Sequence, residues 1–311
     1  MTNLAPSEVV QAQAWTANDM TATSNWKFLW PSNWKSEVEA LESWAKQQNN
    51  PIDNLTQESV ATPEFDQLAN QIKYEIKHGS GVAWIQGEES LSKPTLNLLF
   101  LKLSLAMGNT IDTYGRLYGI LDTGKDYTSE AIPVSQTNAP TGVHTDSSQR
   151  TVQPKVLGLC CLTPAVEGGK SKIVSAAQVH ENLRKTAPQK LEILYNNYIR
   201  DLVTPGSDKN IKSILENCFP IFEYSNEKLS IRYMRYWIEK GHQRVNQPLS
   251  KEVLKALDML DKELNSVENT LSFYMNSGDM VFVDNTKVLH DRDGFIDTPD
   301  QKRVYTRVWI D

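Results

Sequence analysis

The sequence predicts a mainly β fold: a β-sandwich or jelly-roll core, with helices packed on it and inserted into it. Short strand-like apolar segments occur both before and after a helix-rich stretch at about residues 175–265. The 311 residues contain no internal repeat, low-complexity tract or convincing linker, and all-β barrel folds of this length often form one unit. We therefore predict a single domain over residues 1–311, with its sequence motifs in residues 80–311.

The first 60 residues are predicted to form an N-terminal extension rich in tryptophan. Five of the eight tryptophans lie there, among Asn, Gln, Ser and Thr. They are Trp15, Trp26, Trp30, Trp34 and Trp44. Because Trp is enriched at binding sites and interfaces, one interpretation is an aromatic flap over a site or a dimer contact. A dimer contact would make the protein a homo-oligomer. The favoured alternative is that these side chains pack on the outside of the core, since large aromatic residues mostly contribute burial.

The first half of the chain has two predicted helices and two predicted strands. A helix is expected over 62–78, where a threonine that can cap it and a proline at its first position precede apolar residues at helical spacing. Residues 81–85 predict a strand. A second helix is expected over 93–107, because the next residue is a glycine that can end it. The apolar residues 157–162 predict a short strand.

The second half has two further predicted helices and five predicted strands. One helix is expected to begin at Ser175, and an amphipathic helix is expected over 251–264 with Ser250 as its cap. A hairpin is predicted from strands at 221–224 and 229–236 around a polar turn. The remaining predicted strands are 270–274, 280–283 and 303–310.

Composition argues against several classes of protein. The formal net charge is −6 and no run of Lys and Arg occurs, so we expect no nucleic-acid partner. The longest apolar runs, such as 98–101, are too short to cross a bilayer, and the N-terminus lacks a secretory signal pattern. Three cysteines argue against a disulfide framework, and adjacent Cys160 and Cys161 are expected to be buried on opposite strand faces. We therefore expect a cytoplasmic protein without a membrane partner.

His144 and Asp146, together with the distant His290, form the candidate metal site. On a strand, residues i and i+2 point the same way, so His144 and Asp146 can reach one metal from one face. His290 follows a predicted turn, buried strand and second turn at 278–285. Two imidazoles and one carboxylate can hold a divalent iron and leave three positions open, as in non-haem Fe(II) oxygenases. The alternative is structural: a hydrogen-bonded histidine at 144 and a turn histidine at 290.

Arg303, Tyr305 and Arg307 share one face of the predicted strand at 303–310. On a buried face, two guanidinium groups would be costly without anions to pair with them. A dicarboxylate co-substrate could supply one anion, because arginine binds carboxylates in a bidentate manner. The alternative is a solvent-facing pair of arginines bound to surface acids. The apolar residues of this strand favour an arginine face that points inward.

Several short motifs follow one another along residues 80–311. They are Gly-Val-His-Thr-Asp at 142–146, Leu-Cys-Cys-Leu-Thr-Pro at 159–164, Glu-Gly-Gly-Lys-Ser at 167–171, Gly-Asp at 278–279, Asp-Asn at 284–285, His290, and Arg303 with Arg307. This ordered set resembles the taurine dioxygenase (TauD/TfdA) family of Fe(II)- and 2-oxoglutarate-dependent oxygenases. The resemblance implies a double-stranded β-helix, the jelly roll of clavaminate synthase-like proteins. The first 60 residues carry no signal of this family.

The resemblance implies a role for each residue of the candidate metal and co-substrate sites. His144, Asp146 and His290 would ligate Fe(II), where O2 reacts. Arg303 would bind the distal carboxylate of 2-oxoglutarate, helped by the hydroxyl group of Ser171. Many family members have threonine at the latter position, and serine keeps the hydroxyl group.

Arg307, Ser147, Gln149 and Arg232 are the candidate substrate contacts. The resemblance places Arg307 near the substrate or the keto-acid end of the co-substrate, and in taurine-using members it faces the sulfonate. Ser147 and Gln149 follow the metal motif and indicate a polar pocket, and Arg232 could be a second anion contact. We expect a small anionic or zwitterionic substrate. The polar residues after Asp146 argue against taurine itself.

The activity that the resemblance implies is hydroxylation of a C–H bond in a small carboxylate- or amino-acid-type substrate, in natural-product biosynthesis. Asp146 argues against halogenation, because related halogenases carry Gly or Ala in its place. Four alternatives stay open: a desaturase or cyclase on the same metal, an oxidase of a sulfonate-like substrate, a zinc hydrolase, and a non-catalytic jelly-roll binding protein. A zinc hydrolase would give Arg303 and Ser171 no evident task, and a non-catalytic protein would need neither the complete ligand set nor Arg303 and Arg307.

Overall fold

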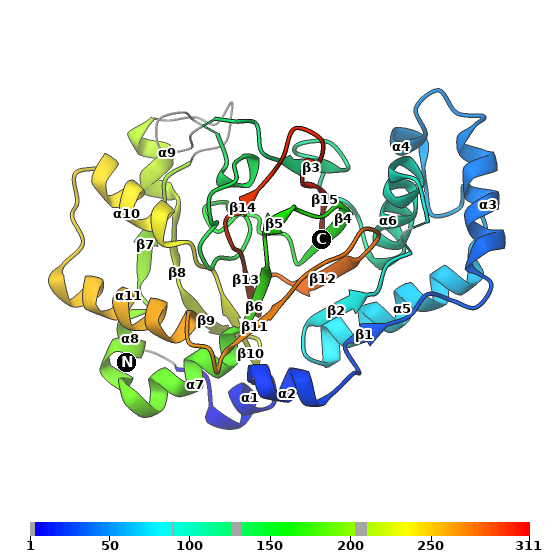
Figure 1. The fold of residues 1–311 in the computed structure, drawn as a ribbon. Coiled ribbons are helices and arrows are strands. Elements are labelled where there is room, and N and C mark those ends of the chain that lie inside the picture. The colour runs from blue at the N-terminus through cyan, green and yellow to red at the C-terminus, as the bar shows by residue number, and fades with distance from the viewer. Residues whose placement is uncertain (1–3, 89, 126–131, 203–209) are drawn as a thin grey trace.

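Two β-sheets face each other in the middle of the molecule, and helices cover the outer face of each sheet (Figure 1). The computed structural model describes residues 4–88, 90–125, 132–202 and 210–311. The arrangement gives four layers in order: helices, the larger sheet, the smaller sheet, and a second group of helices. This is the predicted jelly-roll core with flanking and inserted helices.

The larger sheet has six strands in the order β1-β2-β12-β4-β15-β3. β1 pairs parallel with β2, and all other neighbours pair antiparallel. Strands from the beginning, middle and end of the chain therefore lie side by side. Their bounds are β1 Lys27–Phe28, β2 Val82–Ile85, β3 Tyr118–Leu121, β4 Val156–Thr163, β12 Met280–Asp284 and β15 Val304–Ile310.

The smaller sheet has three antiparallel strands in the order β11-β6-β13. Their bounds are β6 Ser171–Ser175, β11 Thr270–Phe273 and β13 Val288–Arg292. Three further strand pairs lie around this core, namely β14-β5, β10-β9 and β7-β8. Their bounds are β5 Glu167–Gly168, β7 Asn197–Ile199, β8 Cys218–Pro220, β9 Phe222–Ser225, β10 Lys228–Ile231 and β14 Phe295–Ile296.

Alternate residues of the central strands enter different apolar layers. In β12, Val281 packs between the two sheets, whereas Phe282 packs under the helices on the outer face. In β4, Cys161 packs between the two sheets and Cys160 packs under the helices, and both are fully buried, as predicted. This two-residue period fixes which side chains of a strand can line the space between the sheets.

The helices form two groups. α5 and α6 pack on the larger sheet, and α3 packs on these two helices; α7 packs on the smaller sheet, and α8 and α11 pack on α7 (Figure 1). The bounds are α1 Ser7–Gln11, α2 Ala17–Ala22, α3 Trp34–Ala45, α4 Pro51–Asn54, α5 Pro63–His78, α6 Lys93–Met107, η1 Val134–Gln136, α7 Ala176–Thr186, α8 Pro188–Ile193, α9 Ile211–Glu216, α10 Arg235–Arg244 and α11 Lys251–Leu264.

The tryptophans of the N-terminal segment pack against the core, which is the alternative that the sequence favours. Trp26 is buried, its indole N–H donates to the Met20 carbonyl at 2.8 Å, and its ring contacts Trp84 and Phe273. Trp30 packs edge-on against Phe65 of α5. The segment also supplies β1, an edge strand of the larger sheet.

Local signals predict three of the long helices but not α3, and the side chain of Thr62 makes no capping hydrogen bond at the start of α5. The helices expected at 62–78, 93–107 and 251–264 are α5, α6 and α11, and the hydroxyl group of Ser250 accepts the N–H of Val253 at 3.3 Å as a cap. Ser175 caps α7 in the same way. Each of these signals acts over a few neighbouring residues.

Two expectations about strands are wrong. The strand predicted at 229–236 ends at Ile231. The last residues of the predicted strand belong to helix α10 instead, which begins at Arg235 and has Met234 as its N-cap. His144 and Asp146 do not lie on a regular strand: His144 forms an isolated bridge, and Asp146 begins a turn. The sequence pattern also does not predict β13, which carries His290.

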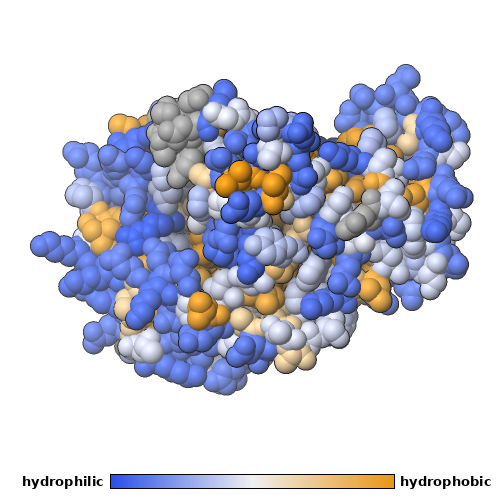
Figure 2. All heavy atoms as spheres, in the orientation of Figure 1, coloured by the Kyte–Doolittle hydropathy of each residue, from blue (hydrophilic) through white to orange (hydrophobic). Residues whose placement is uncertain are grey.

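The visible face of the molecule is mostly hydrophilic, with small separate apolar areas (Figure 2). Such scattered apolar side chains are normal on the surface of a folded protein. None of the helices in the described part of the chain has the length and apolarity that a membrane crossing requires.

Substitution of Gly158 in β4 is expected to destabilise the larger sheet. A Cβ atom there would lie 2.7 Å from both Phe282 Cε1 and Val308 Cγ1, so Gly158→Ala should lower the free energy of unfolding by about 1–3 kcal/mol through overpacking. Gly119→Ala in β3 is the matched control, because its nearest contact is at 3.7 Å, and we expect a change within about 0.5 kcal/mol. Urea denaturation followed by circular dichroism measures both. Equal effects of the two substitutions would contradict the packing argument.

Candidate active site

A single antiparallel bridge brings His144 and His290 together. The backbone N–H of each residue donates to the carbonyl oxygen of the other at 2.9 Å. The two ring centroids are 4.3 Å apart. Backbone pairing, rather than side-chain packing alone, therefore sets the spacing of the two imidazoles.

Asn285 fixes the backbone of Asp146. Its side-chain oxygen accepts the Asp146 N–H at 2.8 Å, and its side-chain nitrogen donates to the carbonyl oxygens of Asp146 and Pro154 at 3.1 and 3.0 Å. Asn285 is fully buried and follows the last residue of β12. The Asp-Asn motif at 284–285 thus ties the turn that carries Asp146 to the larger sheet.

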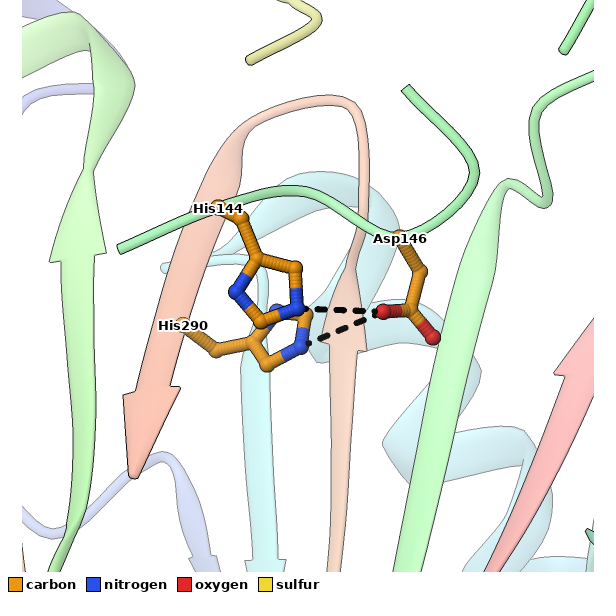
Figure 3. A group of neighbouring side chains, drawn as sticks. All are labelled: His144, Asp146 and His290. Carbon is orange, nitrogen blue, oxygen red and sulfur yellow. Dashed lines mark ion pairs between the residues drawn. The ribbon is translucent and has the colours of Figure 1, made fainter. Parts of the chain in front are cut away.

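The donor atoms of the three residues converge on one point. The Nε2 atoms of His144 and His290 lie 3.4 and 3.5 Å from Oδ1 of Asp146, and Figure 3 shows both rings directed at that carboxylate. All three donor atoms lie within 4.8 Å of one another, and no other group of this kind is found among residues 4–88, 90–125, 132–202 and 210–311. Two imidazoles and one carboxylate on one side of a point match the donor set of a non-haem Fe(II) site.

A hydrogen bond to the backbone orients the ring of His144. Nδ1 lies 2.7 Å from the carbonyl oxygen of Gly142, an acceptor, so Nδ1 carries the proton. The lone pair of Nε2 is then directed into the site, which is the arrangement that metal-ligating histidines usually have. Within the described residues, Nδ1 of His290 has no hydrogen-bond partner.

Oδ2 of Asp146 is held from the opposite side. It accepts the indole N–H of Trp309 at 2.6 Å and lies 3.1 Å from Nη1 of Arg307. Burial alone would raise the pKa of Asp146, but the charge of Arg307 and the two imidazoles hold this pKa well below its usual range. Asp146 is therefore ionised at neutral pH.

The two imidazoles differ in their affinity for protons. Burial alone would lower the pKa of His144, but its hydrogen bond to Asp146 and the charge of that carboxylate raise the pKa above the ordinary value. Burial lowers the pKa of His290, and the nearby His144 lowers it further. His144 therefore binds a proton more readily than His290 does.

A cavity opens beside the three residues, between the two sheets. One part of its wall is apolar and includes Leu159, Ile173 and Val281. Another part is basic and polar and contains Arg303 and Ser171. The residues predicted to bind metal and those predicted to bind the co-substrate therefore line the same space.

Arg303 is buried without full pairing. It is 4% exposed, and within the described residues its Nε and Nη1 atoms have no hydrogen-bond partner. Its guanidinium lies 3.7 Å from the ring centroid of Tyr305. Burial lowers the pKa of Arg303. A desolvated guanidinium with unused N–H groups is stabilised by an anion, and a carboxylate fits its geometry.

A second pocket adjoins the triad on the side of Arg307. It contains Ser147 and Gln149, as well as Arg307 itself. Its aromatic wall is formed by Tyr114, Tyr118, Trp237 and Trp309. The guanidinium of Arg307 lies over the rings of Tyr118 and Trp309, at 4.7 and 4.4 Å from their centroids.

Arg232 lies away from both pockets. Its guanidinium packs over the Phe219 ring at 4.3 Å and donates to the Arg150 carbonyl, and it lines a separate hollow with Glu223. The strand that would have aimed it at the site ends at Ile231. We therefore do not retain Arg232 as a substrate contact.

Sequence reasoning missed two residues of the site. Trp309 contacts Asp146, and its position two residues after Arg307 on one strand is the signal that could have revealed it. Arg292 lines the cavity and donates to the carbonyl oxygens of Thr137, Asn138 and Ala139. It thereby fixes the segment that leads to His144. No sequence signal indicates this role, because the partners are backbone atoms of a distant loop.

Residues 48–309 match the family described as Taurine catabolism dioxygenase TauD, TfdA family. The chain belongs to this family. Family membership confirms the fold class and the oxidoreductase class that the motifs predict.

The chain is similar to several characterised relatives. It is 25% identical to FR-33289 synthase of Streptomyces rubellomurinus over 324 residues, which cover 100% of this chain and 92% of the relative. It is 28% identical to gamma-butyrobetaine dioxygenase of Homo sapiens over 197 residues, which cover 61% of this chain and 48% of that protein.

Solved structures show the same fold at low sequence identity. Asparagine oxygenase in complex with Fe(II), 2S,3S-3-hydroxyasparagine and succinate aligns with a TM-score of 0.68 and 11% identity, over 92% of this chain and 93% of that one. The non-haem iron oxygenase OrfP in complex with Fe and alpha-ketoglutaric acid aligns with a TM-score of 0.64 and 14% identity, over 91% of this chain and 93% of that one.

Binding of Fe(II) is expected to tighten as pH rises from about 6 to about 8. The raised pKa of His144 means that its imidazole keeps a proton to higher pH, and a metal must displace that proton. Affinity is therefore lost as pH falls through this pKa, by about tenfold for each pH unit below it. Anaerobic equilibrium dialysis at a series of pH values measures the dependence. A constant affinity over this range would contradict the assignment of His144 as a ligand.

Proposed function

We propose that this protein is an Fe(II)- and 2-oxoglutarate-dependent dioxygenase that hydroxylates a C–H bond of a small carboxylate- or amino-acid-type substrate, in natural-product biosynthesis. The observation that carries the proposal is one cavity with a His-Asp-His group at one place and an incompletely paired, buried arginine at another. Iron with 2-oxoglutarate and O2 supplies the oxidation of an unactivated C–H bond, and releases succinate and CO2.

In this proposal, His144, Asp146 and His290 hold the iron. Two imidazoles and one carboxylate would hold Fe(II) and leave coordination positions for the co-substrates. The hydrogen bond from Nδ1 of His144 to Gly142 fixes the ring, and Asn285 fixes the backbone of Asp146. The chain therefore holds the three ligands before the metal arrives, which favours binding.

Arg303 and Ser171 are proposed to bind the distal carboxylate of 2-oxoglutarate. The unused N–H groups of Arg303 can donate to both carboxylate oxygens. Ser171, the first residue of β6, adds a hydroxyl donor in the same cavity. The apolar wall accommodates the methylene groups of the co-substrate and excludes water. A zinc hydrolase would use neither group.

The second pocket is proposed to bind the substrate through Arg307, Ser147 and Gln149. Its charged lining residues are Arg307 and the metal ligand Asp146, so an anionic or zwitterionic substrate is favoured. The complexes of related folds point to amino acids: asparagine oxygenase binds 3-hydroxyasparagine, and OrfP binds hydroxylated arginine. The aromatic wall adds stacking surface around such a small polar molecule.

We also propose a cytoplasmic location. The three cysteines are free, and two of them are buried. Thiols without disulfide partners are typical of a reducing compartment. A homo-oligomer stays a prediction that size-exclusion chromatography with light scattering can test.

Asp146→Ala is expected to abolish succinate formation and to remove the weak visible charge-transfer band of the iron–2-oxoglutarate chelate. The substitution takes away the only carboxylate of the donor group. Anaerobic titration of the apo-protein with Fe(II) and then 2-oxoglutarate measures the band, and a coupled assay measures succinate. Unchanged turnover in this variant would contradict the proposal that Asp146 binds iron.

Product analysis of the wild-type reaction separates hydroxylation from desaturation and cyclisation.

Arg303→Ala is expected to raise the KM for 2-oxoglutarate. Loss of a desolvated, charge-assisted pair costs about 2–5 kcal/mol, which corresponds to about 30-fold or more in affinity. Arg232→Ala is the matched control, because this arginine is also largely withdrawn from solvent but lies outside the cavity. If Arg303→Ala changed only the requirement for the prime substrate, the proposed roles of Arg303 and Arg307 would have to be exchanged.

A further inference from the structure

The two oxygens of the Asp146 carboxylate face different partners. Oδ1 lies toward the imidazoles of His144 and His290, at 3.4 and 3.5 Å from their Nε2 atoms. Oδ2 accepts the indole N–H of Trp309 at 2.6 Å and faces Arg307 at 3.1 Å. Oδ1 is thus directed at the candidate metal site, whereas Oδ2 is bound by Trp309 and Arg307.

The surrounding structure fixes the ring of Trp309. The residue is 8% exposed and lies on β15, where its backbone pairs with Leu157 of β4 and its carbonyl oxygen accepts the N–H of Ile111 at 2.8 Å. Tyr114 packs edge-on against the ring, with centroids 5.7 Å apart, and the Arg307 guanidinium stacks over it at 4.4 Å. The indole N–H therefore has one available direction, toward Oδ2.

Trp309 and Arg307 offer Oδ2 different kinds of contact. A guanidinium has five N–H groups and can turn toward another anion, and Arg307 also lines both pockets. An indole has a single N–H, no charge and no acceptor. An anionic substrate at Arg307 would compete with Oδ2 for the guanidinium, but it would not compete for the indole N–H.

We propose that Trp309 is a positioning residue that holds Asp146 as a ligand through one oxygen only. This inference rests on the proposed metal site. As long as the indole occupies Oδ2, the carboxylate cannot rotate to present both oxygens to the metal. One position that a chelating carboxylate would take stays open for a co-substrate, and the ligand geometry is set before the metal binds.

The test is Trp309→Phe, which removes the N–H and keeps an aromatic ring. We expect the dissociation constant for Fe(II) to rise by about 10- to 100-fold, as for other groups that orient metal ligands. The visible spectrum of the Co(II)-substituted protein should also change, because it reports the coordination number. Anaerobic titrations with Fe(II) and with Co(II) supply both measurements without turnover.

Trp26→Phe is the matched control. Trp26 is buried in the same apolar layer, and its indole donates to the Met20 carbonyl at 2.8 Å, but it has no contact with Asp146. A general loss of packing would weaken metal binding in both variants. The proposal requires normal Fe(II) affinity and a normal Co(II) spectrum in Trp26→Phe.

A second variant tests the indole N–H group of residue 309 separately from the shape of the ring. Benzothienylalanine incorporated at position 309 keeps the shape of the indole and lacks its N–H, so it tests the proposal even if the phenylalanine variant does not fold. Unchanged affinity and spectrum with benzothienylalanine overturn the role of Trp309. If Asp146→Ala instead binds Fe(II) as the wild type does, the metal site itself is wrong, and this inference fails with it.

Discussion

The backbone bridge between His144 and His290 is the interaction on which the site depends. It lies between a loop and β13, so the loop that follows η1 is aligned along a strand of the smaller sheet. Two neighbouring contacts extend this alignment: the Thr141 hydroxyl donates to Asp291 at 2.8 Å, and the Arg292 N–H donates to the Thr141 hydroxyl at 2.9 Å. Spacing of the imidazoles is therefore as well defined as the register of a sheet.

Positive charge in the cavity is only partly balanced by the protein. Arg307 faces Asp146, and Arg292 is bound by loop carbonyl groups, but Arg303 keeps unused donors. A buried charge of this kind weakens the folded state unless a partner arrives. An anionic ligand that pairs with Arg303 should therefore stabilise the folded protein, because it binds the folded state and not the unfolded chain.

Much of the fold and of the site can be predicted from the sequence, and the remainder has a physical reason. α5, α6 and α11 begin and end as predicted because caps, prolines and glycines act locally. β13 is not predicted because its hydrogen bonds come from β6 and from the loop at His144. Ordered motifs reveal the candidate ligands, but the contact of Trp309 with Asp146 and the distance of Arg232 from the site depend on tertiary packing.

The position of β15 has a consequence for how the chain folds. This strand lies between β4 and β3, yet both neighbours precede it by more than a hundred residues in the sequence. During synthesis, β4 and β3 each leave the ribosome with an unpaired edge that stays open until β15 follows. The same late strand carries Arg307 and Trp309, so their contacts with Asp146 form only when this gap in the sheet is filled.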